Sequence, residues 1–126
     1  MYYILIGRNP VKVDDFMTWG KWFEAHANMG TRHIGHMNIP ARRPFKKGGK
    51  MLARVNRQRA IPIIISTVFL GLDHNHWNMS GSNPILFESM VFGGIFDQYQ
   101  ARYFTVEEAQ KAHKELVQRV TKTMVI

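Results

Sequence analysis

The residues best suited to chemistry follow a run of strand-forming apolar residues, 63–70, after which come Asp73, His74 and His76. Carboxylate oxygens and imidazole nitrogens are common metal ligands, and His74 and His76 would point the same way in extended chain. Glu88, in the next apolar run, supplies a further candidate ligand. Since a catalytic metal site needs about three protein ligands and an open position, these residues predict a metal-dependent hydrolase or nuclease as one alternative.

The step from Asp73 to His74, followed by Asn75 and His76, superficially resembles the HNH nucleases, in which an Asp-His step lies beside a bound metal. Those nucleases continue directly into a helix that carries the last metal-binding residue, whereas here the strand-like run 84–92 comes next. Asp and Asn also form turns through their own side chains. We therefore expect a structural turn, with no catalytic residue and no bound metal or cofactor, and keep the metal site as the alternative.

Two other polar features have structural explanations. His33 and His36 have an H-x-x-H spacing without a cysteine nearby, and we expect a solvated pair. Glu88 lies among apolar residues, where a carboxylate is costly unless it is paired. It is either a general acid or base, or the partner of an arginine such as Arg54 or Arg102. We expect the arginine pairing.

The strongest feature is a basic segment, residues 42–59, which we call the basic arm. It holds eight of the 17 basic residues and no acidic residue, while the other nine basic residues are matched by nine acidic ones. The net charge of +8 therefore belongs to the arm. Such a segment predicts polyanion binding, with a solvated loop or an acidic protein surface as alternatives. The expected contact residues are Arg42, Arg43, Lys46, Lys47, Lys50, Arg54, Arg57 and Arg59, with Phe45 positioned to stack on a base.

Length and composition place these features in one globular domain. The chain has 126 residues, 45% of them hydrophobic, which is too apolar for a disordered protein. It has no cysteine, no apolar run of the ~18 residues a membrane helix needs, and an N-terminus that does not resemble a signal peptide. We expect a cytoplasmic protein.

Periodicity predicts an α+β domain over residues 1–126, with order β-β-α-β-β-β-α and an irregular arm at 40–60. The sheet is expected to be antiparallel or mixed, with four to five strands, and residues 63–70 and 85–92 are expected to be adjacent antiparallel strands. Asp14 or Asp15 should begin the first helix and Gly30 should end it, while Thr105 and Glu108 form a capping box for the second. Both helices should pack on the sheet through their apolar stripes. These stripes are Phe16, Trp19, Phe23 and Ala27 in the first helix, and Ala109, Ala112, Leu116, Val117, Val120 and Met124 in the second.

Three segments, "STVFLGLDH", "PILFESMVFGG" and "RYFTVEEAQKAH", occur in that order. With the N-terminal "MYYIL", the chain resembles a set of small uncharacterised proteins encoded by tailed bacteriophages and prophages. The resemblance implies a phage protein that acts in the bacterial host cytoplasm. It implies no established activity and no catalytic residues.

These features together predict a non-enzymatic phage-type protein whose basic arm binds nucleic acid or a host nucleoprotein complex, and which inhibits or redirects host machinery. Two alternatives remain open. One is the metal-dependent hydrolase or nuclease that would use Asp73, His74, His76 and Glu88. The other is a subunit of a larger assembly, with the arm threaded into a partner.

Overall fold

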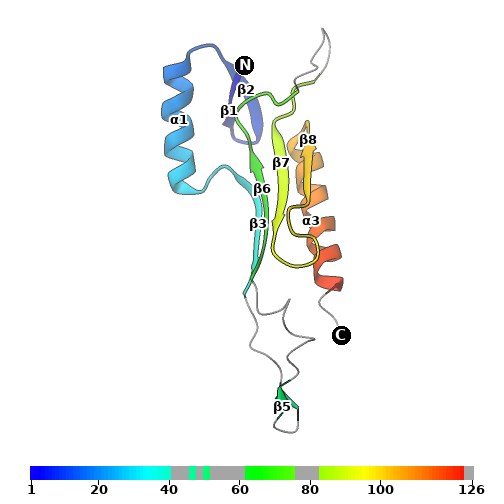
Figure 1. Ribbon diagram of the computed structural model, residues 1–126. Coiled ribbons are helices and arrows are strands. Elements are labelled where there is room, and N and C mark those ends of the chain that lie inside the picture. Colours follow the sequence, from blue (N-terminus) through cyan, green and yellow to red (C-terminus); the bar gives the residue numbers. More distant parts are fainter. Residues whose placement is uncertain (41–45, 48–49, 52–61, 76–82, 124–126) are drawn as a thin grey trace.

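A computed structural model describes residues 1–40, 46–47, 50–51, 62–75 and 83–123 of the chain. The class is α+β, as predicted, and the described residues form antiparallel sheets and two helices (Figure 1). The elements in chain order are β1 (Tyr2–Ile6), β2 (Asn9–Val13), α1 (Phe16–Met29), β3 (His33–Ile39), β4 (Lys46–Lys47), β5 (Lys50–Met51), β6 (Ile63–Phe69), β7 (Phe87–Phe92), β8 (Gln100–Tyr103) and α3 (Val106–Lys122).

The main sheet has four antiparallel strands in the order β3-β6-β7-β8. β6 and β7 are its central strands and pair from Ile64 opposite Phe92 to Phe69 opposite Phe87, so the predicted pairing of these two segments is confirmed. β7 begins at Phe87, a few residues later than the apolar run. Leu86, just before it, still accepts the amide of Leu70 at 2.7 Å and donates to the carbonyl of Tyr103 at 3.2 Å. β3 and β8 form the two edges.

Helix α3 covers one face of this sheet. Thr105 begins the helix by accepting the amide of Glu108 at 3.1 Å, so the predicted N-cap is confirmed. The Glu108 carboxylate accepts the Thr105 hydroxyl at 3.2 Å, in place of the backbone amide that a complete capping box would use. Alternate residues of β6 and β7 point toward the helix, and the period of two places all of them on its side. The buried apolar residues are Ile63, Ile65, Phe69, Leu86, Phe87 and Val91 from the sheet and its approach, and Val106, Ala109, Leu116 and Val120 from α3.

The β1–β2 hairpin adjoins the end of β6. Tyr2 forms a bridge with Leu72, and the amide of Tyr3 donates to the carbonyl of Gly71 at 2.8 Å. Gly71 adopts a positive φ of 79°, a conformation that glycine reaches without a steric penalty. The indole Nε1 of Trp19 donates to the same carbonyl at 3.1 Å, so α1 and the hairpin are fixed to one point at the end of the sheet.

Helix α1 begins at Asp15 and ends at Gly30, whose φ is 71°, as predicted. The prediction that its stripe packs on the main sheet is wrong. α1 lies against β1 and β2, on the opposite side of the strands from α3, and none of its 14 residues, all described, is fully buried. Phe16 is 56% exposed and Ala27 is also exposed, because the small hairpin covers only part of the stripe.

Trp22 makes the contact with the main core that the stripe was expected to make. Its ring meets Phe69 edge-on at a centroid distance of 5.6 Å and stacks on His26 at 4.2 Å. This residue lies outside the stripe of Phe16, Trp19 and Phe23, so helical spacing alone did not indicate it.

The segment between β3 and β6 departs from the predicted irregular arm at one place. The backbone of Lys46–Lys47 pairs antiparallel with that of Lys50–Met51 as β4 and β5. The sequence between them is Gly-Gly, a two-residue hairpin signal. The rest of residues 41–61, like Met124 of the second stripe, lies outside the described residues.

A prediction concerns Gly35 in β3, where an added Cβ would lie 2.5 to 2.7 Å from the ring of His113 in α3. Gly35→Ala should destabilise the protein by about 1–3 kcal/mol, because a ring packed against the sheet cannot move freely. The loss should largely disappear in a His113→Ala background, as measured by urea unfolding in a double-mutant cycle.

Gly20→Ala is the control for Gly35→Ala. A Cβ at Gly20 meets no atom within 4 Å, and Gly20 lies inside α1. This substitution should stabilise the protein by about 0.5–1 kcal/mol, since alanine favours helix. If Gly35→Ala destabilised the protein equally with His113 and with Ala at position 113, the proposed contact between Gly35 and the ring would be contradicted.

Candidate functional site

Asp73 organises the turn that follows β6. Its Oδ1 accepts the amide of Asn75 at 2.8 Å and the amide of Ile85 at 3.0 Å. The carboxylate therefore ties the chain leaving β6 to the chain entering β7, which is the turn role expected of it. The negative charge of Asp73 also adds to burial in raising the pKa of Tyr3.

The remaining members of the predicted metal group do not gather around Asp73 in the described residues. Nδ1 of His74 bonds the carbonyl of Leu72 at 2.8 Å. His76 lies outside the described residues. Among the residues that the structure describes, no group of three or more histidines, aspartates and glutamates is arranged to hold a metal ion.

Glu88 lies on the sheet face that α3 does not cover. Its Oε2 accepts Nε of Arg102 at 2.9 Å and Nε2 of Gln100 at 2.8 Å, both from the neighbouring strand β8. Arg102 is thus the arginine that meets it, one of the two named from the sequence. The pair neutralises the carboxylate inside a largely apolar strand.

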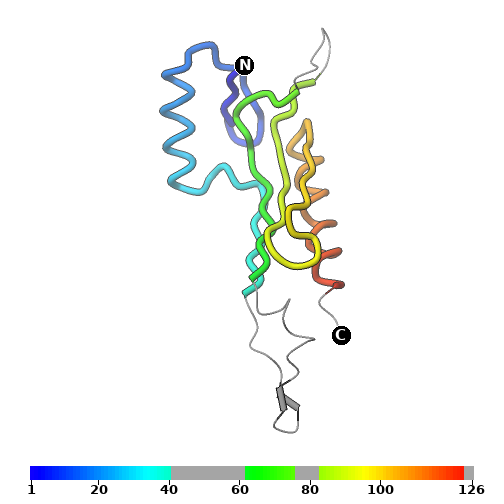
Figure 2. Tube along the Cα trace, viewed as in Figure 1, coloured from blue at the N-terminus to red at the C-terminus, as the bar shows by residue number. Residues whose placement is uncertain are grey.

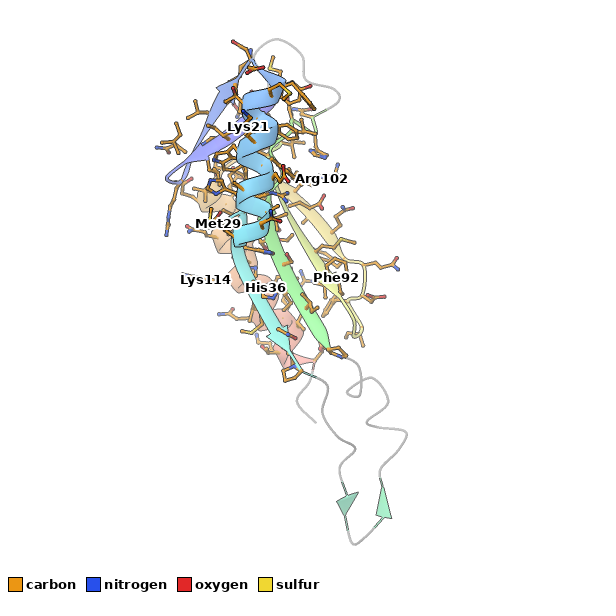
Figure 3. The ribbon with its side chains drawn as sticks, turned by 90° about the vertical axis from the view of Figure 1, so that its left-hand side faces the viewer. Lys21, Met29, His36, Phe92, Arg102 and Lys114 are labelled. Atoms are coloured by element: carbon orange, nitrogen blue, oxygen red, sulfur yellow. The ribbon has the colours of Figure 1, made fainter. Side chains whose placement is uncertain are left out.

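His33 and His36 are both exposed, and their rings meet edge-on at 5.1 Å. Burial first, then the positive charges of His36 and Arg32, lower the pKa of His33. Figure 3 views this side of the molecule, with His36, Phe92 and Arg102 labelled across the uncovered sheet face. The two histidines form the solvated pair expected from the sequence.

The basic arm begins and ends at adjacent strands. Ile39, the last residue of β3, is the register partner of Ile63, the first residue of β6, so β3 ends and β6 begins at the same end of the sheet (Figure 2). The predicted contact residues Arg42, Arg43, Phe45, Arg54, Arg57 and Arg59 lie outside the described residues. Lys46, Lys47 and Lys50 lie in the paired backbone of β4 and β5.

The structure adds a buried polar chain that the sequence analysis missed. Thr67 and Ser89 are fully buried on the α3 side of the sheet, and their hydroxyl oxygens are 2.5 Å apart. Thr67 Oγ1 lies 2.7 Å from Nδ1 of His113, and Ser89 also hydrogen-bonds Tyr103. Period-two alternation places Thr67 and Ser89 inward, which was the available signal, but nothing local in the sequence points to His113.

Burial and the positive charge of His36 lower the pKa of His113. The ring is therefore held in its neutral form over more of the acid range than in the unfolded chain. Burial also raises the pKa of Tyr103, against the lowering effect of its hydrogen bond with Ser89. The chain thus joins four groups that are uncharged at neutral pH, which suits its buried position.

Comparison of the chain with protein-family models, curated proteins and solved structures finds no match. Neither helix in the described part of the chain has the length and apolar content that a membrane crossing requires.

The lowered pKa of His113 predicts a pH dependence of stability. Above about pH 6.5 both folded and unfolded His113 are neutral, and the residue has no effect. As pH falls below that value, the unfolded chain binds a proton that folded His113 does not, so the free energy of unfolding should decrease until the folded pKa is passed. Urea unfolding from pH 8 to pH 5 should show this decrease.

His113→Gln should reduce the slope of stability against pH between about pH 6.5 and 5, whatever its effect on stability at pH 8. Part of the slope should remain, because the pKa of His33 is lowered too. Arg8, His36 and Lys114 are the charged or titratable groups beside His113 and are kept in this variant. An unchanged slope would show that His113 is not the titrating group.

The metal content of the purified protein tests the alternative site. We expect no tightly bound metal at Asp73, His74 and His76, because the Asp73 carboxylate is used to hold two backbone amides. Elemental analysis should find far less than one equivalent of zinc or manganese. About one equivalent, lost in a His74→Ala, His76→Ala double variant, would instead support the metal-dependent hydrolase or nuclease.

Proposed function

We propose that this protein is a non-enzymatic binding protein that holds a polyanion, either nucleic acid or a nucleoprotein complex, through its basic arm. The observation that carries the proposal is the separation of charge along the chain. Residues 42–59 contain eight basic residues and no acidic residue, whereas the remainder of the chain has nine of each. A neutral body that bears one strongly positive segment is suited to a partner of high negative charge density.

The attachment of the arm supports the same function. Both of its ends join strands of the main sheet at the register pair Ile39–Ile63, and β6 is a central strand whose inward residues are buried. A segment anchored at both ends on a packed sheet keeps its point of attachment fixed when it binds. The cost of ordering the arm on a partner is then confined to the arm itself.

Lysine and arginine contacts with phosphates provide affinity with little sequence information. Phe45 lies among the arm's cations in the sequence, and an aromatic ring there adds base stacking on single strands. We accordingly propose binding that depends strongly on salt and weakly on base sequence. RNA and DNA are both within this class of partner.

The biological setting follows from the resemblance to phage proteins. A phage-encoded protein of this kind would act in the cytoplasm of the bacterial host, where binding to a host nucleoprotein complex inhibits or redirects it. An acidic protein surface, or an assembly into which the arm is threaded, would satisfy the same charges. A pull-down with and without nuclease separates these partners, because only nucleic-acid-dependent partners are lost after nuclease.

Salt-dependent binding measures the contribution of the arm. The logarithm of the affinity should fall with the logarithm of the salt concentration by ~0.7–0.9 per phosphate contacted. Replacing Arg42, Arg43, Lys46 and Lys47 with alanine should reduce this slope by up to about four contacts' worth. Fluorescence anisotropy with a labelled oligonucleotide at several salt concentrations gives both slopes.

The matched control removes four exposed lysines from the body, Lys12, Lys21, Lys111 and Lys122, and leaves the arm intact. Its net charge equals that of the arm variant, but its salt slope should stay close to wild type. Thermal unfolding of the arm variant should change little, since exposed substitutions usually alter stability by less than ~0.5 kcal/mol. Normal binding combined with a much lower unfolding temperature would show that the arm is packed structure and would exclude this function.

A further inference from the structure

A cavity of about 300 Å³ opens at the β3 edge of the main sheet. Three separate parts of the chain line it: Arg8 from the turn between β1 and β2, Ile34 from β3, and one face of α3. The α3 residues are Gln110, His113 and Lys114. Their spacing of three and four places them together on one side of the helix.

The lining is rich in hydrogen-bond donors and carries no carboxylate. Arg8 and Lys114 are exposed cations at the mouth, while Gln110 and His113 are half-buried. A second, smaller cavity of about 130 Å³ lies on the other flank of α3 and contains Glu115 beside Arg119. The contrast matters because a neighbouring carboxylate would compete with an anion for the cations, and only the first cavity is free of one.

Among the described residues, no partner engages the cations of the larger cavity. Within the described part of the chain, the side chains of Arg8, Gln110 and Lys114 make no hydrogen bond or ion pair, and the one ion pair found there joins Arg102 to Glu88. Guanidinium and ammonium groups supply several donors each and accept none. Their donors are available to a ligand with several acceptor oxygens and negative charge.

We propose that this cavity binds a phosphate group, held by Arg8 and Lys114 with Gln110 and His113 as further donors. The volume is at the low end of the range for ligand pockets, roughly 300–1,000 Å³, which suits a small anion or one phosphate of a longer chain. Arginine and lysine are the residues most used for phosphate, and charge-assisted hydrogen bonds to it are strong. The site is independent of the basic arm and does not require the proposed function to hold.

Binding of phosphate in the cavity can be followed through His113. Its Nδ1 is engaged by Thr67, and when the hydroxyl donates to it, the neutral ring carries its hydrogen on Nε2 and is a donor there. Arg8 and Lys114 line the same cavity as His113, and burial, together with the charge of His36, lowers the pKa of His113. A phosphate beside it has the opposite electrostatic effect, so binding should raise the pKa of His113.

The test uses nuclear magnetic resonance of the full-length protein at pH 7. Inorganic phosphate is titrated against chloride at constant ionic strength while the ring signals of His113 are followed. In the wild type these signals should shift in a saturable manner. In an Arg8→Ala, Lys114→Ala double variant, phosphate should bind at least about tenfold more weakly, since one charge-assisted hydrogen bond accounts for a tenfold change or more.

The control variant, Lys12→Ala with Lys111→Ala, removes the same charge from exposed positions that do not line the cavity. It should bind phosphate as the wild type does. A variant with Arg42, Arg43, Lys46 and Lys47 replaced by alanine should also retain phosphate binding in the cavity. The cavity proposal can therefore fail or hold independently of the proposal that the arm binds a polyanion. Circular dichroism should show that both double variants fold, as expected for exposed residues.

An eight-residue oligodeoxythymidine, titrated in the arm-variant background, distinguishes the source of the phosphate. Saturable shifts with inorganic phosphate assign the cavity to a free phosphate group. If the signals of His113 shift with the oligonucleotide but not with inorganic phosphate, and the shift is lost in the Arg8→Ala, Lys114→Ala variant, the cavity binds a phosphate of nucleic acid. The proposal is overturned if neither ligand shifts His113, or if the cavity variant and the control variant bind equally well.

Discussion

β6 and β7 pair with their inward residues opposite one another, Phe69 facing Phe87 and Ile65 facing Val91, and this register determines which side of the sheet α3 can cover. A slip of one residue would turn every inward side chain to the other face. β3 pairs on the outer side of β6 and β8 on the outer side of β7, so both edges take their positions from the central pair. β3 contributes Ile39 to the attachment of the basic arm and Ile34 to the lining of the larger cavity, so both depend on this register.

The polar chain contributes to the same register from within the core. The buried apolar residues form two clusters, one around Ile65 and Leu116 and one around Phe69 and Val106. Thr67 and Ser89 lie between them in the strands, where buried hydroxyls are costly unless paired. In the described residues no buried side-chain polar atom lacks a hydrogen-bond partner. Any slipped pairing would separate these hydroxyls from each other and from the helix. The hydroxyls are therefore hydrogen-bonded only in the observed register, and the polar chain disfavours the alternatives.

The strands other than β4 and β5, the helix caps and the pairing of β6 with β7 were predictable, because alternation, capping residues and turn signals are local in sequence. The position of α1 was not, because a stripe such as Trp19 and Phe23 indicates which face is buried but not the surface that covers it. Charge considerations in the sequence named two candidate partners for Glu88, Arg54 and Arg102. The structure shows that the partner is Arg102, which lies on the neighbouring strand. Thr67 and His113 are 46 residues apart, and their contact requires the complete fold.

Some cations of the chain have a role in the fold, and others are free to bind a ligand. Arg119 and Lys122 lie in the last turn of α3, where they complement the helix dipole, and Arg102 neutralises Glu88. Arg8 and Lys114 have no such role in the described residues, and the arm's charges are not balanced by any acid within the arm. Ile34 at the cavity and Ile39 at the arm's root lie on one strand, about 17 Å apart at the usual rise per residue. A nucleic-acid chain carries several phosphates over that length, so one edge strand brings both proposed contacts within reach of a single polyanion.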